Sequence, residues 1–233
     1  MIDKNAIIRV FHVHKRYGSK NALIDVTFDV AKNEFLFISG PNGAGKSSLL
    51  KLLYLAEGVS EGEILIDGIN LSRISRKRIP LLRRKIGVIF QDFKLIPTKT
   101  VFENVALVLE VAGNKKHTIQ KKVKRLLRAG GMEEKLDSYP AGLSSGEQQR
   151  VAFARAVAGD PKIILADEPT GSLDDESAGI ILDILKKLHV LGTTVIIATH
   201  NKELIHTISA RTIYLEKGRL KQDIPRTSKI ISL

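Results

Sequence analysis

The fold of this chain is decided by the stretch Gly40-Pro41-Asn42-Gly43-Ala44-Gly45-Lys46-Ser47. This stretch matches G-x-x-x-x-G-K-[ST], the pattern of a phosphate-binding loop. The apolar run before it, 35–39, predicts a short buried strand, and residues 48–53 after it have a helical pattern. Strand, glycine loop and helix, in that order, form the context that such a loop requires.

The residue types of this loop suit the binding of a triphosphate. Glycines let the backbone N–H groups face a phosphate, and the start of the next helix adds free N–H groups and the positive end of its dipole. Lys46 can reach the β- and γ-phosphates, and the Ser47 hydroxyl can hold Mg²⁺. The alternative is a glycine turn followed by a chance Lys-Ser pair, but the agreement of motif and flanks argues against it.

Length and composition set the class of protein. With 233 residues, the chain can form one large domain or a core with a subdomain. The absence of Cys excludes disulfides and thiolate metal sites. No apolar run approaches the ~18 residues of a membrane span, and residues 1–5 do not open a signal peptide. If the protein serves a membrane process, we expect another chain to supply the membrane segment.

The formal net charge of +12 favours anionic partners, namely nucleotides, nucleic acid or the anionic cytoplasmic leaflet. The basic residues concentrate in two clusters. The first holds Arg73, Arg76, Lys77, Arg78, Arg83, Arg84 and Lys85, and the second holds Lys115, Lys116, Lys121, Lys122, Lys124, Arg125 and Arg128. Solvated helix faces explain both at least as well as binding patches do. The second cluster has no interleaved aromatic residue, which weakens a nucleic-acid interpretation based on stacking.

Strand and helix patterns divide the chain into a core and an insert. Residues 7–13, 23–30 and 62–68 predict strands around the loop, some of them antiparallel. Helical periodicity at 100–112 and 116–129 predicts a mostly helical subdomain over about 92–158.

The α/β pattern then resumes. We expect buried strands at 85–90, 162–166 and 194–199, a helix over 175–191 with Ile180, Ile184 and Leu188 on its apolar stripe, and a terminal hairpin near 212–218. Unbroken apolar strands with helices between them indicate a parallel sheet covered on both faces.

Residues with acidic or basic side chains directly follow two of the predicted buried strands. Asp167 and Glu168 follow the strand 162–166, and His200 follows the strand 194–199. Ligands of open parallel sheets bind at these carboxyl ends. Phosphoryl transfer needs a carboxylate near Mg²⁺ and a group that orients the attacking water, which suits Asp167 and Glu168. His200 can contact the γ-phosphate, and the alternative for it is an ordinary residue at a helix start.

The stretch Leu143-Ser144-Ser145-Gly146-Glu147-Gln148-Gln149-Arg150 precedes an Ala-rich helix. Ser144 and Glu147 have the spacing of a capping box, as do Ser145 and Gln148, so a capped helix start explains the serines without any function. A capped start also leaves N–H groups free for a phosphate, and both interpretations stay open.

Six motifs together resemble those of the ATP-binding-cassette ATPases, in order and spacing over nearly the whole chain. In chain order they are the Walker A loop (Gly40–Ser47), the Q-loop glutamine (Gln91), the signature (Leu143–Glu147), Walker B (Ile163–Glu168), the D-loop (Ser172–Asp174) and the switch histidine (His200).

The resemblance implies a single P-loop NTPase domain of the α/β class over 1–233. Its RecA-like core and antiparallel β subdomain would take about 1–91 and 159–220, its α-helical signature subdomain about 92–158, and a C-terminal tail 221–233.

The resemblance also implies roles for individual residues. The catalytic side chains would be Lys46, Gln91, Glu168 and His200, and the Mg²⁺ ligands Ser47, Gln91 and Asp167. ATP would be bound by Tyr17, stacked on adenine, and by Gly40, Pro41, Asn42, Gly43, Ala44, Gly45, Lys46, Ser47 and Ser48. A second copy of the chain would add Ser144, Ser145, Gly146 and Glu147, because in this family the signature faces the nucleotide of the opposite subunit.

An ATP-dependent homodimer is therefore expected, since the chain holds one Walker A loop and one signature. Ser145 departs from the family pattern, which usually has Gly there. Its side chain would either crowd the γ-phosphate or add a hydroxyl donor.

Within the family, residues 82–97 and 100–113 look very like the bacterial cell-division ATPases. That resemblance implies a place on the inner face of the cell membrane and an integral membrane partner that regulates cell-wall hydrolysis. The partner's cytoplasmic helix would bind through the region after Gln91, in a groove formed with Phe93, Leu95, Ile96, Val101 and Phe102. The alternative for these five residues is an ordinary core.

Two other functions are compatible with the sequence. One is an ATPase of the lipoprotein-release or macrolide-export type, which shares the same cassette. The other is a soluble cassette acting on nucleic acid or ribosomes, which the charge of +12 keeps open. Such proteins usually carry two cassettes or large insertions, which are absent here, so no specific nucleic acid is expected.

Overall fold

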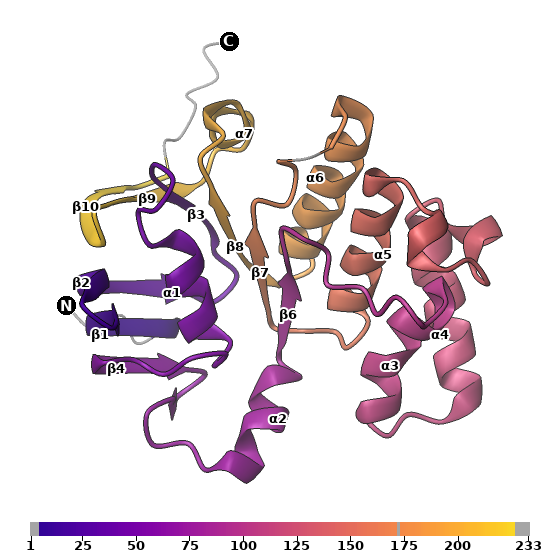
Figure 1. Ribbon diagram of the computed structural model, residues 1–233, viewed down its shortest axis with the longest axis horizontal. Coiled ribbons are helices and arrows are strands. Elements are labelled where there is room, and N and C mark those ends of the chain that lie inside the picture. Colours follow the sequence, from indigo (N-terminus) through magenta and orange to yellow (C-terminus); the bar gives the residue numbers. More distant parts are fainter. Residues whose placement is uncertain (1–4, 172, 227–233) are drawn as a thin grey trace.

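A six-stranded sheet forms the centre of the protein, described here by a computed structural model that covers residues 5–171 and 173–226 (Figure 1). Its strand order is β10-β9-β3-β8-β7-β6, and only β10 runs antiparallel to its neighbour. The strands are β3 (Phe35–Ser39), β6 (Ile86–Ile89), β7 (Ile163–Asp167), β8 (Thr194–Thr199), β9 (Arg211–Glu216) and β10 (Arg219–Ile224). Every residue of β3 and β8 is buried, which confirms the predicted parallel sheet with both faces covered.

A second, antiparallel sheet lies on the left of Figure 1 and has the order β2-β1-β4-β5. Its strands are β1 (Ala6–Tyr17), β2 (Lys20–Ala31), β4 (Glu61–Ile66) and β5 (Ile69–Asn70). The predicted antiparallel strands are confirmed, although β1 extends beyond the expected end at Val13. Helix α1 (Lys46–Leu53) packs between the two sheets through Leu49, Leu50, Leu52 and Leu53, which share one core with both.

A group of three helices forms the right side of Figure 1: α3 (Val101–Val111), α4 (Lys116–Ala129) and α5 (Ser145–Val157). The two helices predicted near 100–112 and 116–129 are confirmed as α3 and α4. Their apolar faces meet in a separate core that includes Val105, Leu109, Val123 and Leu127. Asn104 is fully buried there and ties the preceding loop to α3, because its side-chain amide bonds both the N–H and the C=O of Ile96.

The remaining helices cover the sheet and its ends. They are α2 (Ile79–Arg83), α6 (Asp175–Val190), α7 (Lys202–Thr207) and the 3₁₀ turns η1 (Arg76–Arg78), η2 (Glu133–Lys135) and η3 (Pro140–Gly142). In α6 the predicted stripe is wrong by one position, because Ile181 and Leu185 are fully buried while Ile184 and Leu188 lie at the edge of the contact. The run Ile180-Ile181-Leu182 is apolar around the helix, so packing against the sheet selects the face.

Two expectations fall partly outside the described residues. Ser172 of the D-loop and residues 227–233 of the predicted tail are not described, and residues 221–224 of that tail belong to β10. Among the described residues, no helix has the length and apolar composition needed to cross a bilayer.

Candidate nucleotide-binding site

The glycine loop joins the buried carboxyl end of β3 to the start of α1. Gly40 and Gly45 have φ angles of 145° and 107°, which only glycine adopts readily. A Cβ at Gly40 would lie 2.1 Å from the Leu215 carbonyl oxygen, and one at Gly45 would lie 2.6 Å from that of Ala22. The loop therefore needs glycine at both positions, for conformation and for space, and it brings Lys46 to the sheet edge.

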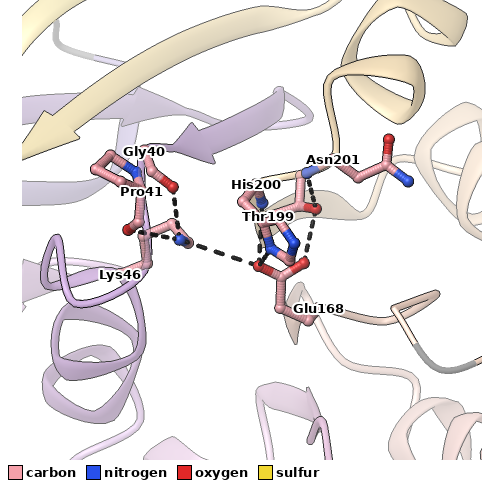
Figure 2. Close-up of polar contacts among 7 residues, drawn as sticks. All are labelled: Gly40, Pro41, Lys46, Glu168, Thr199, His200 and Asn201. Carbon is pink, nitrogen blue, oxygen red and sulfur yellow. Dashed lines mark hydrogen bonds and ion pairs between the residues drawn. The ribbon is translucent and has the colours of Figure 1, made fainter.

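Lys46 lies buried at the first position of α1. Its Nζ donates to the carbonyl oxygens of Gly40 at 2.7 Å and Pro41 at 3.2 Å, and stands 4.0 Å from Oε1 of Glu168 (Figure 2). The ammonium is thus held across its own loop by neutral carbonyls. A phosphate oxygen can replace those carbonyls without moving the backbone of the loop, because only the flexible side chain has to turn.

Glu168 comes directly after β7 and is fixed by residues at the end of β8, as Figure 2 shows. Its Oε2 accepts from the Thr199 hydroxyl at 2.8 Å. Its Oε1 accepts from the backbone N–H of His200 at 3.0 Å and lies 2.6 Å from Nδ1 of that histidine. The two residues predicted to act on water and on the γ-phosphate are therefore in direct contact with each other.

Asp167 is the last residue of β7 and has a buried Oδ1 that lacks a hydrogen-bond partner among the described residues. Burial raises the pKa of this carboxyl group, and a hydrogen bond with Ser47 lowers it in part. An unpaired buried carboxylate oxygen next to a serine hydroxyl fits a hard cation that takes oxygen ligands. Mg²⁺ in particular is commonly held by one or two carboxylates plus substrate phosphates.

A cavity of about 210 Å³ joins these groups. It is lined by the loop and by the ends of three strands, through Asn42, Gly43, Ala44, Gly45, Lys46, Ser47, Ser48, Gln91, Asp167, Glu168 and His200. Most of the predicted site residues of one chain thus meet at the carboxyl edge of the parallel strands, where ligands of such sheets bind.

Tyr17 does not line this cavity. Burial and the neighbouring Glu57 carboxylate raise the pKa of its hydroxyl group, Ser48 lowers that pKa in part, and the ammonium of Lys15 stands 4.9 Å from its ring centroid. The exposed ring therefore lies beside the start of α1, and its stacking on adenine stays a prediction.

The signature residues also lie outside the cavity of their own chain. Ser144 and Glu147 form the capping box at the start of α5, with Ser144 N–H donating to the Glu147 carboxylate at 2.8 Å and Glu147 N–H to the Ser144 hydroxyl at 3.2 Å. The alternative box does not form, because the Gln148 amide bonds the Leu143 carbonyl instead. Gly146 is buried, and a Cβ on it would lie 2.4 Å from the Ser177 hydroxyl oxygen. Any larger residue here would therefore require Ser177 to move, whereas Ser145 is exposed.

Sequence reasoning missed two residues that position the site. Thr199 orients Glu168, and its place directly before His200 could have indicated it. Arg155 of α5 donates to the carbonyls of Phe93 at 2.7 Å and Lys94 at 2.6 Å, just after Gln91. Phe93 and Lys94 have positive φ angles, of 59° and 49°, so the turn that they form is strained. Arg155 holds this turn, and no local sequence signal reveals the contact.

The prediction that these five residues form a groove is wrong. A groove of about 550 Å³ runs between β6 and α3, and none of Phe93, Leu95, Ile96, Val101 and Phe102 belongs to its lining. Val101 is fully buried, and Leu95 and Phe102 pack against the helical core instead. The apolar lining comes from Phe90 and from a later part of α3, including Leu107, Val108 and Val111.

Comparison with known proteins shows which family the chain resembles. The profile of the ABC transporter family matches residues 23–171. The chain is 42% identical over 219 residues to the cell division ATP-binding protein FtsE of Streptococcus pneumoniae serotype 2, covering 94% of this chain and 95% of that protein. It is 40% identical over 226 residues to the methionine import ATP-binding protein MetN of Photobacterium profundum, covering 97% of this chain and 65% of that protein. The dimeric ATP-binding cassette MJ0796 bound to ADP and Pi superposes with a TM-score of 0.88 at 35% identity, covering 95% of this chain and 99% of the cassette.

We predict that Asp167→Asn raises the stability of the nucleotide-free protein at neutral pH, because it removes a buried charge whose pKa is raised. A raised folded-state pKa means that the carboxyl group supports folding below the ordinary pKa of Asp and loses this contribution as pH rises through the folded value. The gain should therefore grow with pH and vanish in acid. Thermal unfolding across pH measures it, with the exposed Asp137→Asn as control. A variant less stable than the parent at pH 7 would refute the prediction.

We also predict that Arg155→Leu lowers kcat for ATP hydrolysis by about 10- to 100-fold with little change in KM, because the strained turn after Gln91 loses both its donors. Arg155→Lys, which keeps one donor group, should recover part of the rate. Steady-state kinetics measures both variants, and urea unfolding shows whether they remain folded. Equal rates for parent and Arg155→Leu would exclude this positioning role.

Proposed function

Because the chain belongs to the ABC transporter family and is an ATPase most like the FtsE cell-division proteins, we propose that it is the ATP-hydrolysing subunit of an FtsE–FtsX-type membrane complex. In this role, ATP-driven dimerisation is coupled to a membrane partner that regulates cell-wall hydrolysis during bacterial division. The observation that carries the ATPase function is the meeting of Lys46, Asp167, Glu168 and His200 around one cavity. The similarity to FtsE, which spans 94% of the chain, supports the finer assignment.

The reaction proposed is in-line attack of water on the γ-phosphate of ATP. Glu168 polarises the water, with its carboxylate oriented by the Thr199 hydroxyl and the His200 N–H. Lys46 exchanges its two carbonyl acceptors for phosphate oxygens and offsets their charge, and the ring of His200 turns from Glu168 to the γ-phosphate. Ser47, Gln91 and Asp167 would hold Mg²⁺, which neutralises charge on the β- and γ-phosphates.

A second copy of the chain completes this site. The signature residues 144–147 stand outside the cavity of their own chain, at a helix start, where N–H groups outside the capping box can bind a phosphate. A head-to-tail pair would place each signature over the other chain's nucleotide, with the exposed hydroxyl of Ser145 near the γ-phosphate. The dimeric assembly named for the similar MJ0796 cassette supports this arrangement.

The membrane partner would bind in the groove between β6 and α3. Its apolar lining, which includes Phe90 and the exposed Val111, suits an amphipathic helix. Phe90 directly precedes Gln91, so the groove adjoins the nucleotide site. With an FtsX-like integral membrane protein in this groove, the chain would lie on the inner face of the cell membrane.

The similarity to MetN favours a second candidate, the ATPase subunit of a solute importer. The chain matches about two thirds of the length of that protein, and the methionine import in its name is a property of the whole protein. Both functions use the same hydrolysis and the same dimer. The identity of the membrane partner separates them.

We predict that Glu168→Gln binds ATP, forms a stable dimer and hydrolyses ATP at least about 100-fold more slowly than the parent, because the general base is lost while the contacts to phosphate remain. Light scattering should give twice the chain mass of 25.7 kDa in saturating Mg-ATP. Lys46→Ala is the matched control, since it weakens nucleotide binding and should stay monomeric. A monomer of Glu168→Gln under these conditions, or near-normal turnover, would contradict the assigned roles.

We further predict that Val111→Glu abolishes capture of an FtsX-like protein from detergent-solubilised membranes of the native organism, because a carboxylate would be buried in an apolar contact. Val190→Glu is the matched control, as Val111 and Val190 are both exposed valines at the last position of a helix. Mass spectrometry of the captured proteins gives the result. Capture of the permease of a solute importer by the parent would favour the second candidate.

A further inference from the structure

We propose that the exposed basic segment Arg76–Leu81, which spans η1 and the start of α2, binds the anionic headgroups of the membrane surface. This inference goes beyond the proposed function, on which it rests for the presence of a membrane. It assigns the protein its own contact with lipid, separate from its contact with a protein partner.

Charge sets this part of the chain apart. From Gly68 to Gln91 the sequence contains no Asp or Glu, and it contains seven basic residues: Arg73, Arg76, Lys77, Arg78, Arg83, Arg84 and Lys85. The local charge is therefore uniformly positive over two dozen residues, which makes a strong field for an anionic surface.

The free charges of this cluster are concentrated in η1. Arg73 pairs with Glu63, and Lys85 with Asp67 at 2.7 Å. The side chains of Arg76, Lys77 and Arg78 have no ion pair or hydrogen bond within the described part of the chain, and all three are exposed. These three cations are thus available to an external partner.

Two other arginines fix the direction in which the segment faces. Arg83 donates to the carbonyl of Leu55 at 2.8 Å, at the end of α1, and Arg84 donates to the carbonyl of Val111 at 2.5 Å, at the end of α3. Leu82, directly before Arg83, is buried in the core shared by the two sheets. Because these hydrogen bonds fix the position of α2, the position of η1, which directly precedes α2, is fixed as well.

An exposed apolar side chain accompanies the cations. Leu81 is 56% exposed, and Pro80 before it is exposed as well. Basic residues around an exposed leucine suit the bilayer interface, where the cations meet headgroups and the apolar group enters the acyl boundary. Nucleic acid fits less well, because residues 68–89 contain no aromatic side chain on which a base could stack.

The position of the segment separates it from the nucleotide site. Helix α2 leads into the N-terminal end of β6, whereas Gln91 follows the other end, so the segment and the cavity lie at opposite ends of one strand. Figure 1 shows α2 far from α7, which follows His200. Pro80, Arg83 and Arg84 border the groove assigned to the membrane partner. A partner seated there would bring Arg76–Arg78 to the membrane surface.

Sedimentation with lipid vesicles tests the proposal on the purified full chain without a partner. The parent is expected to bind vesicles of phosphatidylglycerol and phosphatidylcholine and not pure phosphatidylcholine, with binding that weakens as salt rises. Each basic residue near an anionic bilayer contributes about fivefold to partitioning. The variant Arg76→Gln/Lys77→Gln/Arg78→Gln should therefore bind roughly a hundredfold more weakly. Leu81→Ser should give a smaller loss, of about two- to tenfold.

The matched control removes the same charge elsewhere. Lys217→Asn/Arg219→Gln/Lys221→Gln changes three exposed residues of the β9–β10 hairpin and should bind within about twofold of the parent. Equal losses in both triple variants would show an effect of net charge alone and would overturn the proposal. The proposal would also be overturned if the parent did not bind anionic vesicles. A third contrary result uses poly-uridylate as an RNA probe: the η1 variant would lose binding to this RNA but keep its binding to vesicles.

The outcome is distinguishable from failure of the proposed function. The η1 variant should retain Mg-ATP-dependent dimerisation and capture of the membrane partner in detergent, since it alters neither the cavity nor the apolar lining of the groove. Loss of vesicle binding with both properties intact supports a separate lipid contact. If the parent failed to capture an FtsX-like protein but still bound vesicles, only the partner assignment would be refuted.

Discussion

The structure depends on placing two adjacent carboxylates and one ammonium at the same edge of a parallel sheet. Asp167 is partly buried and has an unpaired oxygen, and Glu168 lies 4.0 Å from the ammonium of Lys46. Such an arrangement costs stability, because buried charges lose hydration that their partners replace only in part. The packed strands β3, β7 and β8 hold these groups in place. In the proposed function, ATP and Mg²⁺ are the partners that would satisfy them.

Contacts from this edge extend to two other surfaces. Gln91 joins the nucleotide cavity to the strained turn at Phe93 and Lys94, which Arg155 of the signature helix holds. Arg155 also lines the groove beside β6, as do Pro80, Arg83 and Arg84 of the α2 region. One set of residues therefore joins the nucleotide cavity to α5, to the groove proposed for the partner and to the basic segment proposed to contact lipid.

Much of this could be predicted from the sequence, because local patterns encode it. The glycine loop, the buried strands and helices α3 and α4 follow from periodicity and capping, and the acids and His200 follow from their places at strand ends. The rest depends on packing between distant segments. The face of α6, the residues lining the groove and the Arg155 contact with the turn after Gln91 join residues far apart in sequence. Single-chain patterns carry no signal for such pairings.

The central claim, that each chain supplies half of two composite sites, is tested most directly by cross-linking in trans. The chain contains no cysteine, so Asn42→Cys and Ser145→Cys each introduce a unique thiol at an exposed position. Both are made with Glu168→Gln, one carries a size tag, and the two are mixed with a short bismaleimide. We predict a covalent heterodimer that forms only in Mg-ATP. Homodimers of either single variant in equal yield, or no cross-link with nucleotide bound, would contradict the account.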